Sequence, residues 1–388
     1  SYYPLTLINT AARFRGGAYS VIGTLLGEKW TGPYIIIYIL TNISLSMYCL
    51  SFADYAMPFL PMISRKAIAI GILVLLYVLN YMGIDKFSRF QNLIVSTLVI
   101  ALATFSAFGI TKLEPNYYDP NTFLPGGILG LLRATAQLTF ATGGASIIAN
   151  LSAEAKNPTK DIPRVMIYST IGVAVLYAFM ATIAAGVLPV EQVANQPLTL
   201  VAEQTLPKGL YVFFVIGGAW MALISTLNSQ LASATKPLMQ ACNDGWFPNR
   251  LAKLHNKYKT PIYLLSLFFL VGLLPIVFNL DISILSRITT TVGSVTNSMV
   301  ALGLLKLRKV LPDSWSKSPL YISDGVANLL VVISVGIYAL QAVLLGSSLS
   351  LPLLLGNVGV IVFAFIFGHI RYKTGNIKSE ISFEIEDN

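Results

Sequence analysis

The sequence predicts an all-α membrane protein whose chain crosses the bilayer many times. Hydrophobic residues make up 55% of the 388 residues and charged residues only 11%, whereas charged residues account for about a quarter of a soluble globular protein. Apolar stretches of roughly 18–25 residues recur along the chain, and each is long enough to cross a bilayer core of about 30 Å. A β-barrel would instead show short strands of alternating polarity.

Hydropathy places ten complete spans and one partial span along the chain. Residues 1–12 have the character of a helix end, and the complete spans follow at 32–59, 66–84, 87–110, 126–153, 163–188, 209–237, 261–280, 283–307, 321–345 and 350–371. Residues 1–371 therefore form a transmembrane domain, and residues 372–388 form a polar C-terminal tail. We expect the span at 126–153 to be broken near residues 142–145.

Lysines and arginines are concentrated in alternate loops between the predicted spans. The loops that contain Lys86, Lys156, Lys236 and Lys306 belong to this set, as does the segment that starts at Arg371. Cytoplasmic loops carry an excess of these residues, so we expect this set and the C-terminus to be cytoplasmic, in a plasma or inner membrane. The net charge of +9 then reflects topology, and we expect no nucleic-acid partner.

Reactive and metal-binding side chains are sparse. Cys49 and Cys242 lie in or at the end of apolar segments, which predicts two free thiols and no disulfide-linked subunit. His255 and His369 flank spans, and the spans contain no cluster of acid, base and nucleophile and no cofactor motif. We therefore expect no enzyme activity, no metal and no cofactor, in a monomer or homodimer.

The break in the span at 126–153 is the strongest functional signal. Gly143 and Gly144 follow Thr142, and Ser146 comes two residues later. Unwound backbone at bilayer depth persists only where protein buries it or a ligand uses it, so the pattern predicts a carrier with a binding site at the membrane midplane. Close helix packing is the alternative explanation of the glycine pair, and the neighbouring hydroxyls favour the site.

Several segments stand in an order that resembles a known family. They read ARFRGGAY at 12–19, FATGGAS at 140–146, EAKNPTKDIPR at 154–164, TK followed by NDGWFP within 235–248, and TP at 260–261. These are similar to the motifs F-P-x-x-G-G-x-Y, F-A-F-x-G-F-E, E-x-K-N-P-x-R-x-I-P-R, S-R…A-R-D-G-x-L-P and T-P of the amino acid–polyamine–organocation superfamily of amino acid permeases. Arg15 and Lys160 replace a proline and an arginine of these motifs.

The resemblance implies a leucine-transporter-type fold. In that fold two inverted repeats of five helices, with helices one and six discontinuous, are followed by two further helices. Residues 1–12 would end the second helix, so this chain would start within helix two and lack helix one. Since helix one supplies half of the substrate backbone site in the family, we expect an isolated chain without it not to transport.

The resemblance also implies secondary transport of an amino acid across a membrane by alternating access, as a permease or exchanger. Backbone carbonyls of Phe140, Ala141, Thr142 and Gly143 are the candidates for binding the substrate ammonium, and Gly144 belongs to the same break. Ala145 and Ser146 stand where relatives carry an aromatic residue and, in carriers of cations, a glutamate. With no acidic residue nearby in the span, an unpaired charge is costly, and we expect a neutral or small polar substrate. The alternatives are a transport-inactive amino acid sensor on the same fold and a carrier of another small organic solute.

Coupling and gating residues are less clearly indicated. No lysine occurs between Arg89 and Lys112, which argues against proton coupling through a lysine there, and the coupling ion, H⁺ or Na⁺, stays open. The hydroxyls of Ser225, Thr226 and Ser229 are candidates for a cation site, although bonding back to their own helix is favoured. Glu154 and Arg164 are candidate elements of a cytoplasmic gate.

Two further groups of polar residues in the spans have two interpretations. They are Asn42, Ser44 and Ser46 in one span, and Thr289, Thr290, Thr291, Ser294, Thr296, Asn297 and Ser298 in another. The second group would line an outer vestibule or gate, or else form hydrogen bonds between helices, and the first group is similarly ambiguous.

Overall fold

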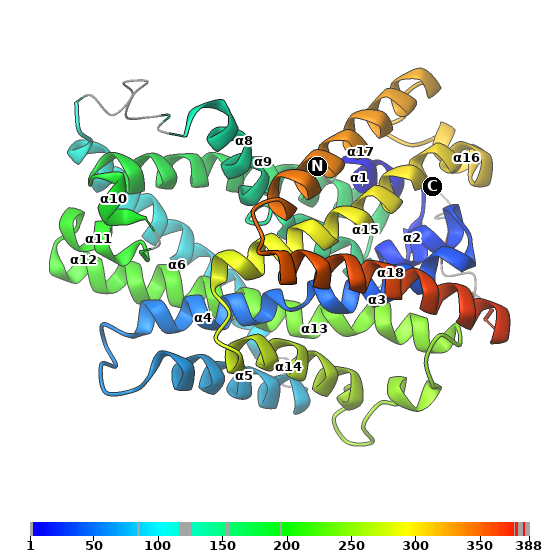
Figure 1. The fold of residues 1–388 in the computed structure, drawn as a ribbon, viewed down its shortest axis with the longest axis horizontal. Coiled ribbons are helices and arrows are strands. Elements are labelled where there is room, and N and C mark those ends of the chain that lie inside the picture. Colours follow the sequence, from blue (N-terminus) through cyan, green and yellow to red (C-terminus); the bar gives the residue numbers. More distant parts are fainter. Residues whose placement is uncertain are drawn as a thin grey trace.

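Long apolar helices run side by side along the long axis of the molecule (Figure 1). The computed structural model describes residues 3–83, 86–115, 124, 126–152, 155–194, 196–375, 377–378 and 383–384. Within these residues seven helical runs are long and apolar enough to cross a membrane: Glu28–Ala56, Asn92–Lys112, Pro158–Gly186, Lys208–Asn243, Ile282–Val310, Asp324–Gly346 and Leu351–Thr374. The prediction of an all-α protein that crosses the membrane many times is thereby confirmed.

The helices follow the predicted spans closely. They are α1 Tyr3–Asn9, α2 Ala18–Leu25, α3 Thr31–Thr41, α4 Ser44–Ala56, α5 Arg65–Tyr81, α6 Lys86–Gly109, α8 Gly127–Leu138, α9 Pro158–Gly186, α10 Val190–Val193, α11 Thr199–Thr205, α12 Lys208–Phe213, α13 Met221–Asn243, α14 Ile262–Val277, α15 Ile282–Val310, α16 Pro312–Ser316, α17 Asp324–Gly346 and α18 Leu351–Thr374. A π-helical turn, Phe214–Trp220, joins α12 to α13. Two-residue strands β1, Arg13–Phe14, and β2, Phe383–Glu384, pair antiparallel.

The break in the span predicted at 126–153 lies earlier than expected. α8 ends at Leu138, and a 3₁₀ helix, η3 (Gly143–Leu151), takes the place of a second α-helical half. The hydroxyls of Thr139 and Thr142 donate to the carbonyls of Ala136 and Thr139, at 2.7 and 3.2 Å. Such local side-chain bonds compete with helix hydrogen bonding, so unwinding starts at the first threonine rather than at the glycines.

A second break divides the span predicted as continuous over residues 32–59. α3 and α4 are separated at Asn42 and Ile43, where the hydrogen bonds shorten to the three-residue spacing. The amide of Asn42 donates to the carbonyl of Ile39 at 3.2 Å, and the amide of Leu45 to that of Asn42 at 3.0 Å. The Asn42 side chain also donates to the Tyr38 carbonyl at 2.8 Å, which replaces the backbone partner lost at the break.

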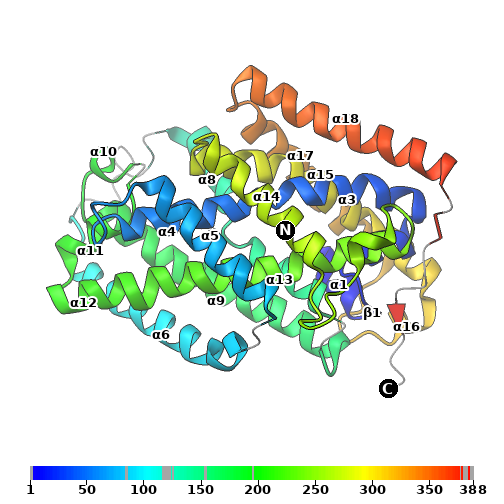
Figure 2. The same cartoon turned by 90° about the horizontal axis from the view of Figure 1, so that it is seen from below.

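α15 occupies the middle of the bundle. In its most apolar stretch, 61% of the residues are buried. The corresponding share is 11% for α9 and 17% for α18, so these two helices present most of their surface to the surroundings. α15 packs against α1, α2, α3, α4 and α17, and α18 crosses the outer side of α3 (Figure 2). The central position of α15 brings its polar residues to the centre of the protein.

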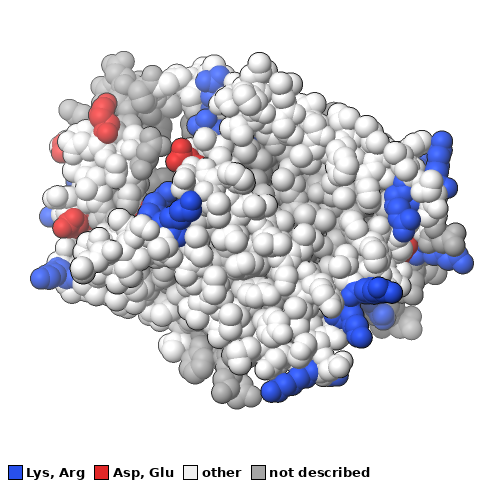
Figure 3. All heavy atoms as spheres, turned by 60° about the horizontal axis from the view of Figure 1, so that its bottom comes forward, with Lys and Arg blue, Asp and Glu red and all other residues white. Residues whose placement is uncertain are grey.

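Charged side chains leave a broad band of uncharged surface between the ends of the molecule. On the face in Figure 3 the lysines and arginines lie toward the two ends, and acidic groups are visible mainly toward one of them. Large apolar side chains such as Val332, Val343 and Leu351 are 66–69% exposed. An exposed apolar surface of this extent is the part of a membrane protein that meets lipid.

One end of the bundle is held by a buried aspartate. The hydroxyl of Tyr19 donates to Asp244 at 2.7 Å, and the Gln240 amide donates to its other oxygen at 2.9 Å. Burial, and then the Asp244 charge, raise the pKa of Tyr19, so the phenol stays protonated and remains a donor. The guanidinium of Arg371, near the end of α18, donates to the Gly245 carbonyl at 2.9 Å. These contacts tie α2, α13 and α18 together.

Gly17 is a position where the structure requires glycine. Its φ is +59°, and a Cβ there would lie 2.0 Å from the Asn150 side-chain oxygen and 2.8 Å from the Asn150 backbone. We expect Gly17→Ala to destabilise the protein by more than about 1 kcal/mol, measured as a lower midpoint of thermal unfolding in detergent. Gly325→Ala, in α17 where a Cβ meets nothing within 4 Å, is the control, and equal midpoints for the two variants would contradict the prediction.

Candidate functional site

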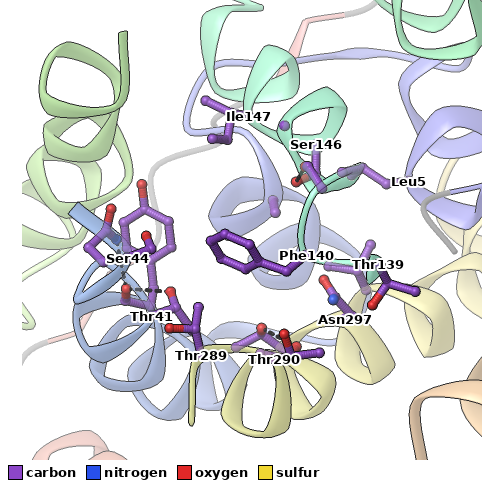
Figure 4. Close-up of a pocket in the computed structure, with 18 of the residues that line it drawn as sticks. Leu5, Thr41, Ser44, Thr139, Phe140, Ser146, Ile147, Thr289, Thr290 and Asn297 are labelled. Atoms are coloured by element: carbon purple, nitrogen blue, oxygen red, sulfur yellow. Dashed lines mark hydrogen bonds between the residues drawn. The ribbon is translucent and has the colours of Figure 1, made fainter. Parts of the chain in front are cut away.

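A cavity of about 190 Å³ lies where the two helix breaks meet α15. The α8–η3 break forms one wall and the α3–α4 break another, as Figure 4 shows with Phe140 and Ser146 on the first and Thr41 and Ser44 on the second. α1, α13 and α17 complete the lining. Segments more than 100 residues apart in the sequence therefore build a single site.

The η3 wall presents backbone and a hydroxyl to the cavity. Gly143, Gly144 and Ser146 line it together with Ile147 and Asn150. A Cβ built on Gly144 would meet nothing within 4 Å, so this glycine is not needed for helix packing. Close helix packing therefore does not explain Gly144, which lines the cavity.

The Phe140 ring projects into the cavity from the turn before η3 (Figure 4). It stacks on Tyr48 of α4 with ring centroids 6.2 Å apart. The Phe140 carbonyl accepts from the Gly143 amide at 3.1 Å, and the Gly143 carbonyl accepts from the Ser146 hydroxyl at 2.8 Å. Two of the four predicted carbonyls, those of Phe140 and Gly143, are thus engaged within the break.

The opposite wall is the polar face of α15. Thr289, Thr290, Thr296 and Asn297 line the cavity, and Figure 4 shows Thr289, Thr290 and Asn297 below the Phe140 ring. The hydroxyls of Thr289 and Thr290 are buried and have no hydrogen-bond partner among the described residues. Buried polar groups are normally hydrogen-bonded, so these two hydroxyls indicate a polar ligand.

Gln230 of α13 bridges the break between α3 and α4. Its amide nitrogen donates to the Ser44 hydroxyl at 2.7 Å and to the Asn42 side-chain oxygen at 3.2 Å. The Gln230 side-chain oxygen is buried with no partner among the described residues, and the residue is 7% exposed and lines the cavity. These two hydrogen bonds orient the Gln230 side chain, and its oxygen can still accept a hydrogen bond.

The predicted site residues divide into two groups. Phe140, Gly143, Gly144 and Ser146 line the cavity. Three others stand in the same segment outside the lining: Ala141, which is exposed, Thr142, which is half-buried, and Ala145, which is buried. The lining residues of α4, α13 and α15 were missing from the predicted site, although the polar runs at 42–46 and 289–298 already singled out two of these helices.

None of the candidate ion and gate residues that the structure describes lines the cavity. Ser225 is buried, whereas Thr226 and Ser229 are exposed, and none of the three is among the lining residues. Arg164 is exposed near the start of α9, and Glu154 lies outside the described residues. A cation at the α13 hydroxyls would therefore not contact a substrate in the cavity.

The cavity is polar without being charged. Its lining contains hydroxyls, amides and aromatic rings, and none of the described lining residues is an aspartate, glutamate, lysine, arginine or histidine. A ligand with net charge would find no counter-charge there, and desolvating an unpaired charge is costly. The site is suited to a neutral or zwitterionic molecule.

Comparison with known sequences assigns the chain to a family. The family described as "Amino acid permease" matches residues 4–370, which covers nearly all of the chain. The chain belongs to the amino acid permease family. The expectation that it is not an enzyme is confirmed by this membership, because the family consists of transporters.

Three relatives of this permease differ in the substrates that their names give. It is 30% identical over 240 residues to a branched-chain amino acid permease of Bacillus subtilis, with 61% of this chain and 50% of the relative covered. It is 26% identical over 191 residues to a methylthioribose transporter of the same species, with 49% and 41% covered. It is 26% identical over 240 residues to the vacuolar cationic amino acid transporter 2 of Arabidopsis thaliana, with 60% and 37% covered. The aligned part of the permease thus spans half the length of these relatives or less.

Proposed function

We propose that this protein is a secondary transporter, either a permease or an exchanger. It moves neutral or small polar amino acids across a membrane by alternating access. The observation that carries the proposal is the uncharged polar cavity at the α8–η3 break. A discontinuous helix at membrane depth is a recurrent way to bind a small solute. The relative named as a branched-chain amino acid permease fits a neutral substrate.

The break supplies both partners that an amino acid backbone needs. The carbonyl end of α8, at Leu138, and the amide end of η3, at Gly143, are separated by four residues of the chain. Helix C-termini attract cations and N-termini attract anions, so the break accommodates the ammonium and the carboxylate of one zwitterion. Thr142 gives η3 no side-chain cap. The Gly143 amide donates to the Phe140 carbonyl, and Gly144, which lines the cavity, has no Cβ to shield its own amide. We assign the substrate backbone to residues 140–144.

The side-chain end of the substrate is assigned to the remaining lining. Ser146 follows the break, with Ala145 buried behind the lining. The Thr289 and Thr290 hydroxyls and the Gln230 carbonyl oxygen lie across the cavity. These groups donate and accept hydrogen bonds without carrying charge. Neutral side chains therefore fit better than basic or acidic ones.

Topology and assembly complete the proposal. We place the transmembrane unit at residues 1–371, in a plasma or inner membrane, with residues 372–378 and the rest of the tail cytoplasmic, because the predicted loops on that side hold most lysines and arginines. Arg164 and Glu154 are assigned to the cytoplasmic gate. Cys49 and Cys242 are buried, which supports a monomer or homodimer without a disulfide-linked subunit.

A single carboxylate should change the charge preference of the site. Ser146 lines the cavity and carries no charge, so Ser146→Asp places a half-buried negative group there without a charged partner among the lining residues. We expect arginine and lysine to bind at least about tenfold more tightly than to the wild type, because an opposite charge offsets desolvation. Competition against a labelled neutral amino acid measures this change. Ser146→Asn, of nearly the same shape, is the control, and equal effects of the two variants would contradict the assignment.

A different neutral solute is the second candidate. The relative named as a methylthioribose transporter and the unpartnered hydroxyls of Thr289 and Thr290 favour an uncharged, hydroxyl-rich molecule. Such a solute needs no zwitterion site at the break. Competition by methylthioribose, together with no competition by any amino acid, would establish this candidate.

A sensor on the same fold differs from a carrier in flux alone. If the protein is extended by an upstream helix one, labelled amino acid that binds it but shows no counterflow in proteoliposomes would identify a sensor. Counterflow stimulated by neutral amino acids would identify the carrier that we propose, and its dependence on sodium or on a pH gradient would name the coupling ion.

A further inference from the structure

A second hollow lies on the outer surface, away from the substrate cavity. It has a volume of about 410 Å³ and lies between the last turns of α15 and the first turns of α17. Its lining consists of Leu305, Lys306, Arg308 and Lys309 on α15 and Asn328, Val331 and Val332 on α17. We call this hollow the α15–α17 groove.

The groove carries a surplus of positive charge. Arg308 forms an ion pair with Asp324 at 2.7 Å, which offsets its charge. Lys306 and Lys309 are exposed, and neither has a hydrogen bond or ion pair with another described residue. Two ammonium groups and the Asn328 amide therefore remain available to an anion at the groove.

The groove opens onto an apolar stripe along α17. Val332 lines the groove and is 69% exposed, and the stripe continues through Leu329, Ile333, Leu340 and Val343, all exposed. Residues 328 and 343 are about 22 Å apart along a helix, which exceeds half of a bilayer core of about 30 Å. A molecule that binds the lysines therefore lies beside an apolar surface of α17 that is long enough to contact an acyl chain across one leaflet.

We propose that the α15–α17 groove binds the headgroup of an anionic phospholipid, with its acyl chains on the α17 stripe. Basic pockets between transmembrane helices are suited to such headgroups. A soluble phosphate would use the lysines but leave the stripe uncovered, and an uncharged lipid would use the stripe but not the lysines. The combination of cations, a concave surface and an apolar continuation selects the anionic lipid.

The test compares an anionic lipid with a zwitterionic lipid that has the same acyl chains. Delipidated full-chain protein is titrated with phosphatidylglycerol or phosphatidylcholine of identical chains, and bound lipid is counted by native mass spectrometry. We expect a preference for phosphatidylglycerol, reduced about tenfold to thirtyfold in the double variant Lys306→Gln/Lys309→Gln, since each lysine near an anionic surface contributes to binding.

The control removes the same charge elsewhere. Lys253→Gln/Lys373→Gln neutralises two exposed lysines outside the groove and should keep the preference. An equal loss in both double variants, or no preference in the wild type, would overturn the proposal. Inorganic phosphate at millimolar concentration should displace little of the lipid, and complete displacement would show a phosphate site rather than a lipid site. Unchanged thermal midpoints show that the variants are folded.

Discussion

Gly144→Leu should abolish amino acid binding and leave the protein folded. A Cβ at Gly144 meets nothing within 4 Å, and Gly144 lines the cavity. A leucine side chain would therefore occupy the volume that we assign to the substrate and cover the amide end of η3. We expect the affinity for a neutral amino acid to fall at least about a hundredfold, because overlap with a ligand cannot be relieved in a packed site. Equilibrium binding of a labelled amino acid to the purified protein measures the loss.

The same substitution at a second open glycine separates blocking from general damage. Gly336, in α17, is exposed and also has nothing within 4 Å of an added Cβ, but it does not line the cavity. Gly336→Leu should bind amino acid as the wild type does. If Gly144→Leu also binds normally, with an unchanged thermal midpoint, the cavity is not the binding site.

Gln230→Met should weaken substrate binding about tenfold. The replacement keeps the length of the side chain but removes the donor to Asn42 and Ser44 and the unpartnered oxygen at the cavity. A hydrogen bond contributes about 0.5–1.5 kcal/mol net, and leaving buried partners unsatisfied costs more. We expect a raised dissociation constant together with a small decrease in thermal midpoint.

Asn228→Leu provides a matched comparison on the same helix. Asn228 accepts from the Asn80 side chain at 2.7 Å, which is another amide hydrogen bond between helices, but it does not line the cavity. This variant should lose stability while keeping its affinity. Affinity losses of equal size in the two variants would mean that Gln230 acts only by holding helices together.

Sequence alone predicted the helices well because length and hydropathy determine which segments enter a membrane. The predicted spans at 87–110, 321–345 and 350–371 differ by at most three residues at either end from Lys86–Gly109, Asp324–Gly346 and Leu351–Thr374. The two breaks were harder. At Asn42 the side chain donates a hydrogen bond to the Tyr38 carbonyl of the same span, where the helix is interrupted. Hydropathy does not register that bond.

The site was predicted only where one local segment builds it. Phe140, Gly143, Gly144 and Ser146 were found because paired glycines and hydroxyls in an apolar span are a local signal. Gln230 lies on the same helix as Asn228, whose side chain bonds to Asn80 of α5 instead. Sequence position does not tell which polar side chain faces a cavity and which faces a helix, since that depends on how helices from distant parts of the chain pack.

The most direct test of a neutral amino acid site at the α8–η3 break is a competition assay. A labelled branched-chain amino acid is bound to the wild type and to Gly144→Leu, and unlabelled neutral, basic and acidic amino acids compete one at a time. The account predicts that neutral amino acids compete, that arginine, lysine and glutamate do not, and that Gly144→Leu shows no specific binding. Arginine as the best competitor, or full binding by Gly144→Leu, would contradict it.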